Sequence, residues 1–191
     1  SIGLGHLPHA VRRNVPLTYA VMDNGIYGLT KGQASPTTEQ SAKRERGLAG
    51  VNEEPLNPVL LVLSAGAGFV ARSHAGNMPH LRSMFREAIR YPGFAFVHVL
   101  AGCVTYQTSS YAEQIYQRCD LLPADYDPTD VMKAMELARG PRFQLGVLYR
   151  RDPGQAPGLG EMDGQATGGV WPPVTQPLSQ DAPSDNEFPG G

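Results

Sequence analysis

The chain has 191 residues, 41% of them apolar, and a formal net charge of −2. This composition is typical of a globular domain with a sizeable core, and the balanced charge gives no sign of a nucleic-acid partner. No apolar run reaches the ~18 residues that a membrane-spanning helix needs.

The start of the chain and its cysteines bear on where the protein works. Ser1 opens directly into patterned sequence, so we expect no signal peptide and interpret the chain as a piece of a longer one. Cys103 and Cys119 are too few for a disulfide framework, which favours a reducing compartment. We therefore expect a cytoplasmic protein that binds neither a membrane nor a nucleic acid.

Apolar runs predict the strands. Residues 9–14 close a short helix, and residues 17–22 form a β-rich run typical of a strand buried on both faces. The run 58–72 passes into a Gly-rich turn and is interpreted as the second strand. Residues 93–100 form the third strand and residues 143–150 the last one.

Caps and apolar periodicity predict the helices. Asn77 is a candidate cap for a helix whose apolar residues recur at helical spacing: Leu81, Met84, Phe85, Ala88 and Ile89. Residues 109–119 form another helix, with Cys119 beside Ile115 on its apolar face, and Asp127-Pro128 starts a further one. Strands that alternate with helices predict an α/β fold with a mostly parallel sheet.

Residues 151–191 have a different composition. They contain 15 Gly or Pro in 41 residues, carry six acidic residues against one basic, and have Trp171 as their only large anchor. Such a segment buries too little apolar surface to offset its ordering entropy. We therefore predict a domain over residues 1–150 and a disordered tail over residues 151–191.

The loop that follows the first strand carries chemistry suited to a phosphate and a metal. The side-chain oxygen of Asn24 and the backbone carbonyl of Ile26 are hard oxygen ligands suited to Mg²⁺. The backbone amides around Gly28, Leu29 and Thr30 can receive phosphate oxygens. Ligands of open α/β sheets bind at such loops, although the same residues also suit an ordinary turn.

A third magnesium ligand, ideally a carboxylate, is expected from elsewhere in the protein. Asp23 is adjacent to Asn24, but in strand geometry its side chain points in the opposite direction. Spacing alone therefore supports a site for a diphosphate and Mg²⁺ without completing it.

Five ordered blocks of the sequence resemble a known family. They are SIGLGHLPHAVRRN, MDNGIYGLTKGQASPTT, GAGFVARSHAGN, GFAFVHVLAGCVTYQ and LGVLYR. They resemble the beta subunit of 2-oxoacid:ferredoxin oxidoreductases, most closely the 2-oxoglutarate type, over roughly residues 1–150. The resemblance implies the thiamine-diphosphate-binding fold, with a mostly parallel sheet and helices on both faces.

The same resemblance implies roles for the residues of the loop. Asn24 and the carbonyl of Ile26 would be Mg²⁺ ligands, and Gly28, Leu29 and Thr30 would contact the diphosphate. The family carries a Gly-Asp-Gly-Asp block just before the position of Ser1, which would supply the missing carboxylate. The chain therefore resembles a C-terminal portion of a beta subunit.

Lys31 and His6 are further candidates beside the cofactor. A fixed cation at Lys31 would hold the carboxylate of a 2-oxoacid, and family members with lysine here use it in that recognition; the alternative is a solvated loop charge. His6 is a candidate pocket contact, or else an ordinary residue at the start of a helix. His74, His80 and His98 show no ligand spacing and are interpreted as ordinary residues.

Cys103 follows the third strand. In the family a cysteine here is the fourth ligand of a [4Fe-4S] cluster whose other three ligands lie in the N-terminal region; a lone cysteine is otherwise a small core residue. The family often has Ser-Pro-Cys where this chain has Ala101-Gly102-Cys103, so the cysteine is kept while the loop differs.

The resemblance implies an oxidoreductase that decarboxylates a 2-oxoacid with thiamine diphosphate, passes electrons to ferredoxin and forms an acyl-coenzyme A. An alpha subunit would be its partner, and no residue here is assigned as the glutamate that activates the cofactor. Three alternatives remain. They are a pyruvate-type member, a truncated non-catalytic chain that keeps only a surface for contact with other subunits, and a nucleotide-binding α/β domain. The last is disfavoured because no G-x-G-x-x-G follows a strand.

Overall fold

The computed structural model describes residues 3–39, 52–103, 105–106 and 109–152. Their strands are β1 (Thr18–Asp23), β2 (Ile26–Tyr27), β3 (Gln33–Ala34), β4 (Phe69–His74), β5 (Ala95–Leu100), β6 (Cys119–Leu121) and β7 (Phe143–Arg150). Their helices are η1 (Leu4–His6), α1 (Leu7–Arg12), α2 (Pro58–Ser64), α3 (Met78–Arg90), α4 (Ser109–Gln117) and α5 (Val131–Arg139).

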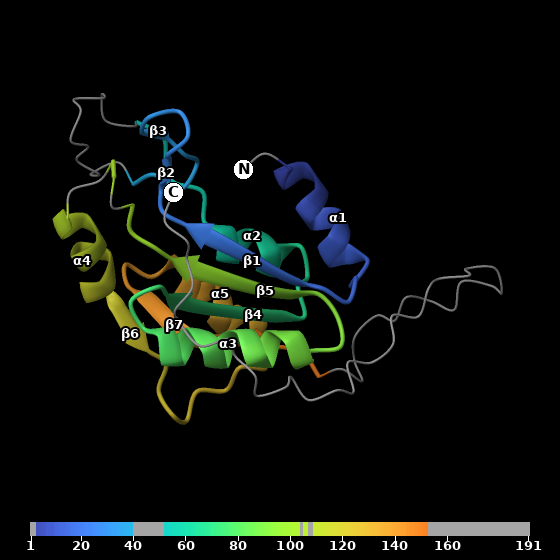
Figure 1. The fold of residues 1–191 in the computed structure, drawn as a ribbon. Helices are drawn as coiled ribbons and strands as arrows, with labels where there is room; N and C mark the ends of the chain where they lie inside the picture. The colour runs from blue at the N-terminus through green and yellow to red at the C-terminus, as the bar shows by residue number, and fades with distance from the viewer. Residues whose placement is uncertain (1–2, 40–51, 104, 107–108, 153–191) are drawn as a thin grey trace, which may run out of the picture. The chain divides into compact units, whose positions relative to one another are not determined.

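The main sheet has the strand order β1-β5-β4-β7-β6 (Figure 1). β1, β5 and β4 run parallel to one another, β7 runs antiparallel to β4, and β6 runs parallel to β7. The predicted mostly parallel sheet is therefore confirmed. Because β7 is reversed, the start of β7 lies at the same edge of the sheet as the carboxyl ends of β1, β4 and β5.

Both faces of the sheet are covered by helices, as predicted (Figure 1). Side chains alternate along each strand, so Val70 and Phe96 pack with α1, α2 and α5 on one face. Ala71 and Val97 pack with α3 on the other. β4 and β5 are buried along almost their whole length because they lie inside the sheet. The prediction that the first strand is buried on both faces is wrong, because β1 is an edge strand whose residues are half-buried or exposed.

The interpretation of the apolar run at residues 58–72 as one strand is wrong. Residues 58–64 form helix α2, capped by the side chain of Asn57, and the strand β4 begins only at Phe69 after the glycine turn. Seven consecutive residues of mostly apolar character fit either structure, because a helix packed against a sheet and other helices buries most of its surface. Asn57 followed by Pro58 is the signal for a helix start.

Two other predictions of helical structure need correction. The helix predicted from Asp127-Pro128 begins at Val131, and Asp130 is its cap, accepting hydrogen bonds from two backbone amides. Asp127 instead accepts hydrogen bonds from Thr129 in the preceding turn. Cys119 is the first residue of β6 rather than a helix residue, although it packs against Ile115 as expected.

The helix predicted after Asn77 is present as α3, with the Asn77 side chain accepting a hydrogen bond from the backbone of His80. Leu81, Met84 and Ala88 face the core as predicted, but Ile89 is 70% exposed. The apolar stripe is therefore narrower than the spacing suggests.

Residues 153–191, which include most of the predicted tail, lie outside the described residues. Arg151 still contacts the core, because its backbone amide donates to Gly68 O at 2.8 Å. No helix among the described residues is both long and apolar enough to cross a membrane.

Candidate functional site

The chain leaves β1 through a tight turn held by two side chains. Asp23 Oδ1 accepts a hydrogen bond from the backbone amide of Gly25 at 3.0 Å, and Asn24 Oδ1 accepts one from the backbone amide of Ile26 at 3.1 Å. Such side-chain turns are typical of Asp and Asn at the end of a strand. Gly25 has a φ of 62°, which glycine adopts at little cost.

A second turn joins the short strands β2 and β3. The amide of Lys31 donates to Gly28 O, and the amide of Gly32 donates to Tyr27 O, both at 3.0 Å. Lys31 has a φ of 66° and an exposed side chain. Leu29 is fully exposed, so the turn presents its backbone and one cation to solvent.

Tyr106 supports this turn from the loop that follows β5. A Cβ placed on Gly32 would lie 3.5 Å from Tyr106 Cβ, and one on Gly28 would lie 3.9 Å from its ring. The same loop carries Cys103, which is half-buried. The structure therefore brings the loop of Cys103 against the turn of Lys31.

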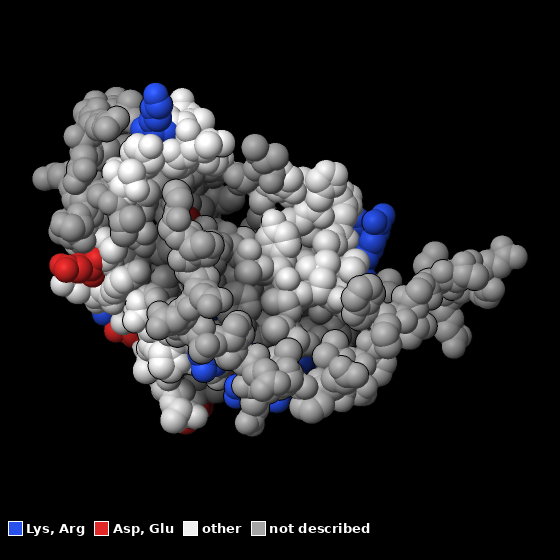
Figure 2. All heavy atoms as spheres, viewed as in Figure 1, with Lys and Arg blue, Asp and Glu red and all other residues white. Residues whose placement is uncertain are grey.

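A cavity of about 300 Å³ lies beside β1. We name it the β1 cavity. Its wall is formed by η1 and α1, by β1 and β2, and by the segments at residues 35–37 and 56–61. Figure 2 shows the surface hollowed between the atoms over β2 and β3 and those over α1. Asn24 and Ile26 both line this cavity.

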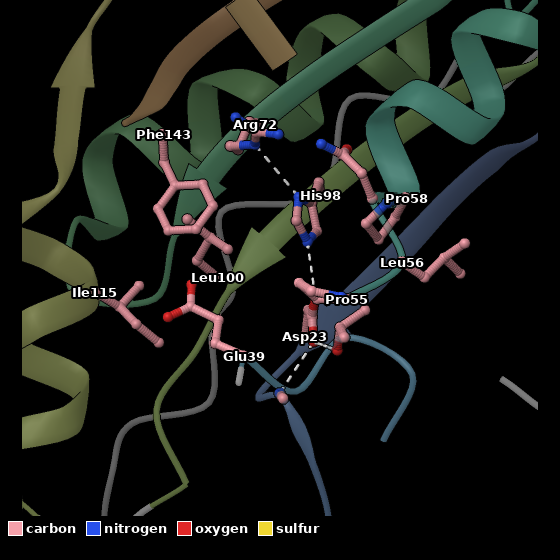
Figure 3. A pocket seen from close by; sticks show the side chains of 13 residues that line it. Asp23, Glu39, Pro55, Leu56, Pro58, Arg72, His98, Leu100, Ile115 and Phe143 are labelled. Carbon is pink, nitrogen blue, oxygen red and sulfur yellow. Dashed lines mark hydrogen bonds and ion pairs between the residues drawn. The ribbon is translucent and has the colours of Figure 1, made fainter. Parts of the chain in front are cut away.

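A smaller cavity of about 120 Å³ lies where β1, β5 and β4 end (Figure 3). We name it the Arg72 cavity. Asp23 lines both cavities. Figure 3 shows Arg72, His98 and Asp23 in one hydrogen-bonded row, with apolar side chains such as Leu100 and Phe143 around them.

The row is defined by short distances between buried groups. Arg72 Nε donates to His98 Nδ1 at 3.3 Å, and His98 Nε2 lies 3.0 Å from Asp23 Oδ2. Asp23 Oδ1 also accepts a hydrogen bond from Thr37 Oγ1 at 2.6 Å. Arg72 is 2% exposed and His98 is 3% exposed. Arg72 Nη1 is buried and has no hydrogen-bond partner among the described residues.

The hydrogen bonds settle the protonation state of His98. Because the Nε of Arg72 can only donate, His98 Nδ1 must accept, and Nε2 then carries the proton that is donated to Asp23. Burial lowers the pKa of His98, and the charge of Arg72 lowers it further, while Asp23 acts in the opposite direction. A neutral imidazole thus joins a guanidinium to a carboxylate.

The pKa values of the two charged ends follow from their surroundings. Burial acts to raise the pKa of Asp23, but the hydrogen bonds from His98, Thr37 and the amide of Gly25 outweigh it and keep that pKa below its usual value. Burial lowers the pKa of Arg72 to about 10, so the guanidinium remains charged at neutral pH.

Phe143 closes one side of the Arg72 cavity. The guanidinium of Arg72 lies 5.3 Å from the centre of the Phe143 ring, and that of Arg118 lies 4.9 Å from it. Arg118 also donates a hydrogen bond to Glu39 at 2.6 Å. The aromatic ring attracts both cations.

Comparison with known families shows to which family the chain belongs. A family model described as thiamine pyrophosphate enzyme, C-terminal TPP binding domain, matches residues 1–99, about half of the chain. The chain belongs to the thiamine pyrophosphate enzymes. A second model, which describes the C-terminal part of the pyruvate ferredoxin oxidoreductase beta subunit, matches residues 103–156.

Individual relatives agree with this assignment. The chain is 37% identical to the 2-oxoacid:ferredoxin oxidoreductase subunit beta of a Sulfolobus species, over 79% of this chain and 54% of the relative. It is 36% identical to 2-oxoglutarate synthase subunit KorB of Archaeoglobus fulgidus, over 69% of this chain and 52% of the relative. The chain therefore spans about half the length of the curated relatives it matches.

A solved structure of a similar protein agrees with these matches. The 2-oxoglutarate:ferredoxin oxidoreductase from Magnetococcus marinus, with 2-oxoglutarate, coenzyme A and succinyl-CoA bound, superposes with a TM-score of 0.77 at 40% identity. The match covers 83% of this chain and 54% of that one. The resemblance to a C-terminal portion of a beta subunit, and the predicted fold, are confirmed.

The structure brings some of the predicted site residues together and leaves others apart. Asn24 and Ile26 both line the β1 cavity. The turn that comes next in the chain, with Gly28, Leu29, Thr30 and Lys31, does not line it. His6 is exposed, and its neighbours Leu4 and Leu7, rather than His6 itself, line the cavity. The described residues contain no group of three His, Cys, Asp or Glu able to hold a metal ion.

Sequence reasoning misses the row of Arg72, His98 and Asp23. The spacing of the histidines marks His98 as an ordinary residue, yet it is buried and hydrogen-bonded on both sides. The sequence signal that could have revealed the row is a charged residue, Arg72, in one apolar strand and a histidine, His98, in another. The two side chains meet, however, only because β4 and β5 are neighbours in the sheet. Strand order is not readable from such short patterns.

Proposed function

We propose that this chain forms the thiamine diphosphate site of a 2-oxoacid:ferredoxin oxidoreductase beta subunit, with 2-oxoglutarate as the substrate. One observation carries the proposal. The turn after β1 places Asn24 and Ile26 on one cavity at the carboxyl edge of the sheet, in a chain that matches the cofactor-binding domain of this enzyme family.

The residues present fit the cofactor. The β1 cavity has apolar walls from Leu7, Ile26 and Phe96, and polar groups from Asn24 and Thr37, which suits a ligand with an aromatic part and a charged part. When bound, thiamine diphosphate supplies the carbanion chemistry that releases carbon dioxide from a 2-oxoacid.

In this proposal the chain's own residues bind and orient Mg²⁺ and the diphosphate of the cofactor. Asn24 Oδ1 and the carbonyl of Ile26 are neutral oxygen ligands for Mg²⁺, which shares its remaining positions with phosphate and water. The amides of Gly28, Leu29 and Thr30 hold phosphate oxygens, and His6 is a further contact. The third protein ligand, a carboxylate, comes from elsewhere in the assembled protein.

Lys31 holds the carboxylate of the 2-oxoacid. Its side chain is exposed in the turn beside the cofactor loop, where a substrate can reach it. Cys103 is the fourth ligand of a [4Fe-4S] cluster that takes the electrons toward ferredoxin. Tyr106 connects Lys31 with Cys103, since the side chain of Tyr106 packs on the turn of Lys31 and the loop of Tyr106 contains Cys103. An alpha subunit and coenzyme A complete the reaction, and the enzyme works in the cytoplasm.

The test uses the full-length protein assembled with its alpha subunit. Calorimetric titration with thiamine diphosphate and Mg²⁺ should show binding, and 2-oxoglutarate should then reduce ferredoxin faster than pyruvate does. Asn24→Leu should abolish magnesium-dependent binding. Faster reduction by pyruvate would favour the pyruvate-type alternative. Absence of cofactor binding in the wild-type complex would favour a non-catalytic chain that keeps only its contacts with other subunits.

A further inference from the structure

The row of Arg72, His98 and Asp23 connects the middle of the sheet to the turn of Asn24. Arg72 on β4 is in register with His98 on β5, and Asp23 is the last residue of β1. The three side chains come from three neighbouring strands and meet at the Arg72 cavity (Figure 3). The proposed function assigns no role to any of them.

We propose that Arg72 and His98 are positioning residues that act through Asp23 to hold Asn24 in its metal-binding orientation. The inference rests on the proposed function, because it concerns the same cofactor site. Asp23 Oδ2 takes the hydrogen bond of His98, while Asp23 Oδ1 takes those of Thr37 and the Gly25 amide. One carboxylate thus links the sheet to the backbone on the far side of Asn24.

This arrangement also leaves Asp23 little remaining capacity to be the missing carboxylate ligand. Three donors already occupy its two oxygens. Thr38 holds the following part of the turn, since its Oγ1 donates to Gly25 O at 2.6 Å. Gly25 is therefore fixed at both its amide and its carbonyl. Asn24 Oδ1 accepts a hydrogen bond from the amide of Ile26, the next residue of the same turn, so the orientation of Asn24 depends on this fixed backbone.

The row is directional because Arg72 is a permanent donor. It forces His98 to accept at Nδ1 and to donate at Nε2, so the imidazole always presents a proton to Asp23. Groups that hydrogen-bond metal ligands from behind are worth about 10- to 100-fold in metal affinity, and here the row acts on Asn24 through the backbone of the turn. If the row served only to stabilise the fold, its loss would lower the stability of the protein, and metal affinity would fall only as far as stability does.

Two substitutions of His98 separate these roles. In His98→Gln the side-chain amide reaches the position of Nε2 and can still donate to Asp23. In His98→Asn the shorter amide can still accept from Arg72 but does not reach Asp23. Both variants lose the ring, so each is the control for the other.

The experiment uses the assembled complex with the full-length protein, saturated with thiamine diphosphate. Binding of Mn²⁺, a spectroscopic substitute for Mg²⁺, is followed by electron paramagnetic resonance, and thermal unfolding is followed without cofactor. We expect His98→Asn to weaken Mn²⁺ binding by about 10-fold or more and His98→Gln to stay within about 3-fold of wild type. The unfolding temperatures of the two variants should be similar.

Equal Mn²⁺ affinity in the two variants would overturn the inference. If His98→Asn does not assemble, Thr37→Val removes the hydroxyl that donates to Asp23 and should weaken Mn²⁺ binding without a matching loss of stability. Wild-type affinity in Thr37→Val would then overturn the inference. A wild-type complex that binds neither Mn²⁺ nor thiamine diphosphate would overturn the proposed function instead.

Discussion

The side chain of Tyr106 packs against the backbone of Gly32. A Cβ on the glycine would lie 3.5 Å from Tyr106 Cβ, and Gly32 has a φ of 98°. Lys31, the residue before it, also has a positive φ of 66°. The turn that carries this lysine therefore contains two successive residues in conformations that L side chains rarely adopt.

Replacing Gly32 by alanine should loosen this turn. The positive φ costs an L residue about 1–2 kcal/mol, which corresponds to a roughly 5- to 30-fold change in an opening equilibrium. Hydrogen exchange followed by mass spectrometry should show faster exchange over residues 26–34. Gly5→Ala is the control, because Gly5 has open space around it and no positive φ. Similar exchange in both variants would show that the turn tolerates a side chain.

Lys31→Ala in the assembled enzyme should lower kcat/KM for 2-oxoacids and leave thiamine diphosphate binding intact. A charge-assisted hydrogen bond contributes about 1.5–3 kcal/mol, or roughly 10- to 150-fold. Steady-state kinetics with ferredoxin reduction gives the ratio.

Two further variants separate charge from backbone strain at this position. Lys31→Gly removes the ammonium but also relieves the positive φ, so its loss of kcat/KM should match that of Lys31→Ala although its turn is more stable. Lys31→Arg should retain part of the activity. An unchanged rate with every 2-oxoacid would identify Lys31 as a solvated loop charge.

Asn57→Ala should destabilise the protein more than Asn77→Ala. Both residues cap a helix, but Asn57 also donates from its amide nitrogen to Ala138 O at 2.7 Å, which joins α2 to α5. Loss of a cap costs about 1 kcal/mol, and an unpaired carbonyl adds about 1–2 kcal/mol. Denaturant unfolding of the full-length subunit should show the difference. Asn57→Ser keeps a capping oxygen without placing a second acceptor against Ala138 O, and it should fall between wild type and Asn57→Ala.

Truncation after Asp152 should leave thermal stability nearly unchanged, as the composition of the following residues predicts. Truncation after Arg150 should lower it, because Arg151 donates to Gly68 O from its backbone and to Gly66 O from its side chain. Scanning calorimetry of the two truncated forms measures the contrast. A large loss of thermal stability in the form truncated after Asp152 would mean that residues beyond 152, such as Trp171, dock on the core.

The strands β1, β5 and β7 could be predicted because each is an apolar run bounded by turn residues. α2 could not be separated from a strand by periodicity, since a helix whose sides are mostly covered carries apolar residues in succession. Asp130 and Asp127 are equally good caps by residue type, so residue type alone could not show that the helix begins after Asp130.

The sequence could suggest candidate site residues only where they are close together in the chain. Asn24, Ile26 and the turn through Lys31 lie within one short segment, so they could be singled out from the sequence, and their roles stay predictions. His98, Arg72 and Asp23 are distant in sequence and meet through the order of the strands. Their hydrogen-bonded row is visible only in three dimensions.

The strand order has a consequence for how the protein folds. β4 and β5 are separated in sequence only by α3 and short connections, so their pairing closes a short loop, whereas β1 pairs with β5 across a much longer stretch of chain. Longer loops cost more entropy to close. We expect β4, α3 and β5 to form the folding nucleus and β1 to dock late. The residues around Asn24 would then be assembled in one of the last steps, and pulsed hydrogen exchange should show protection in β5 before β1.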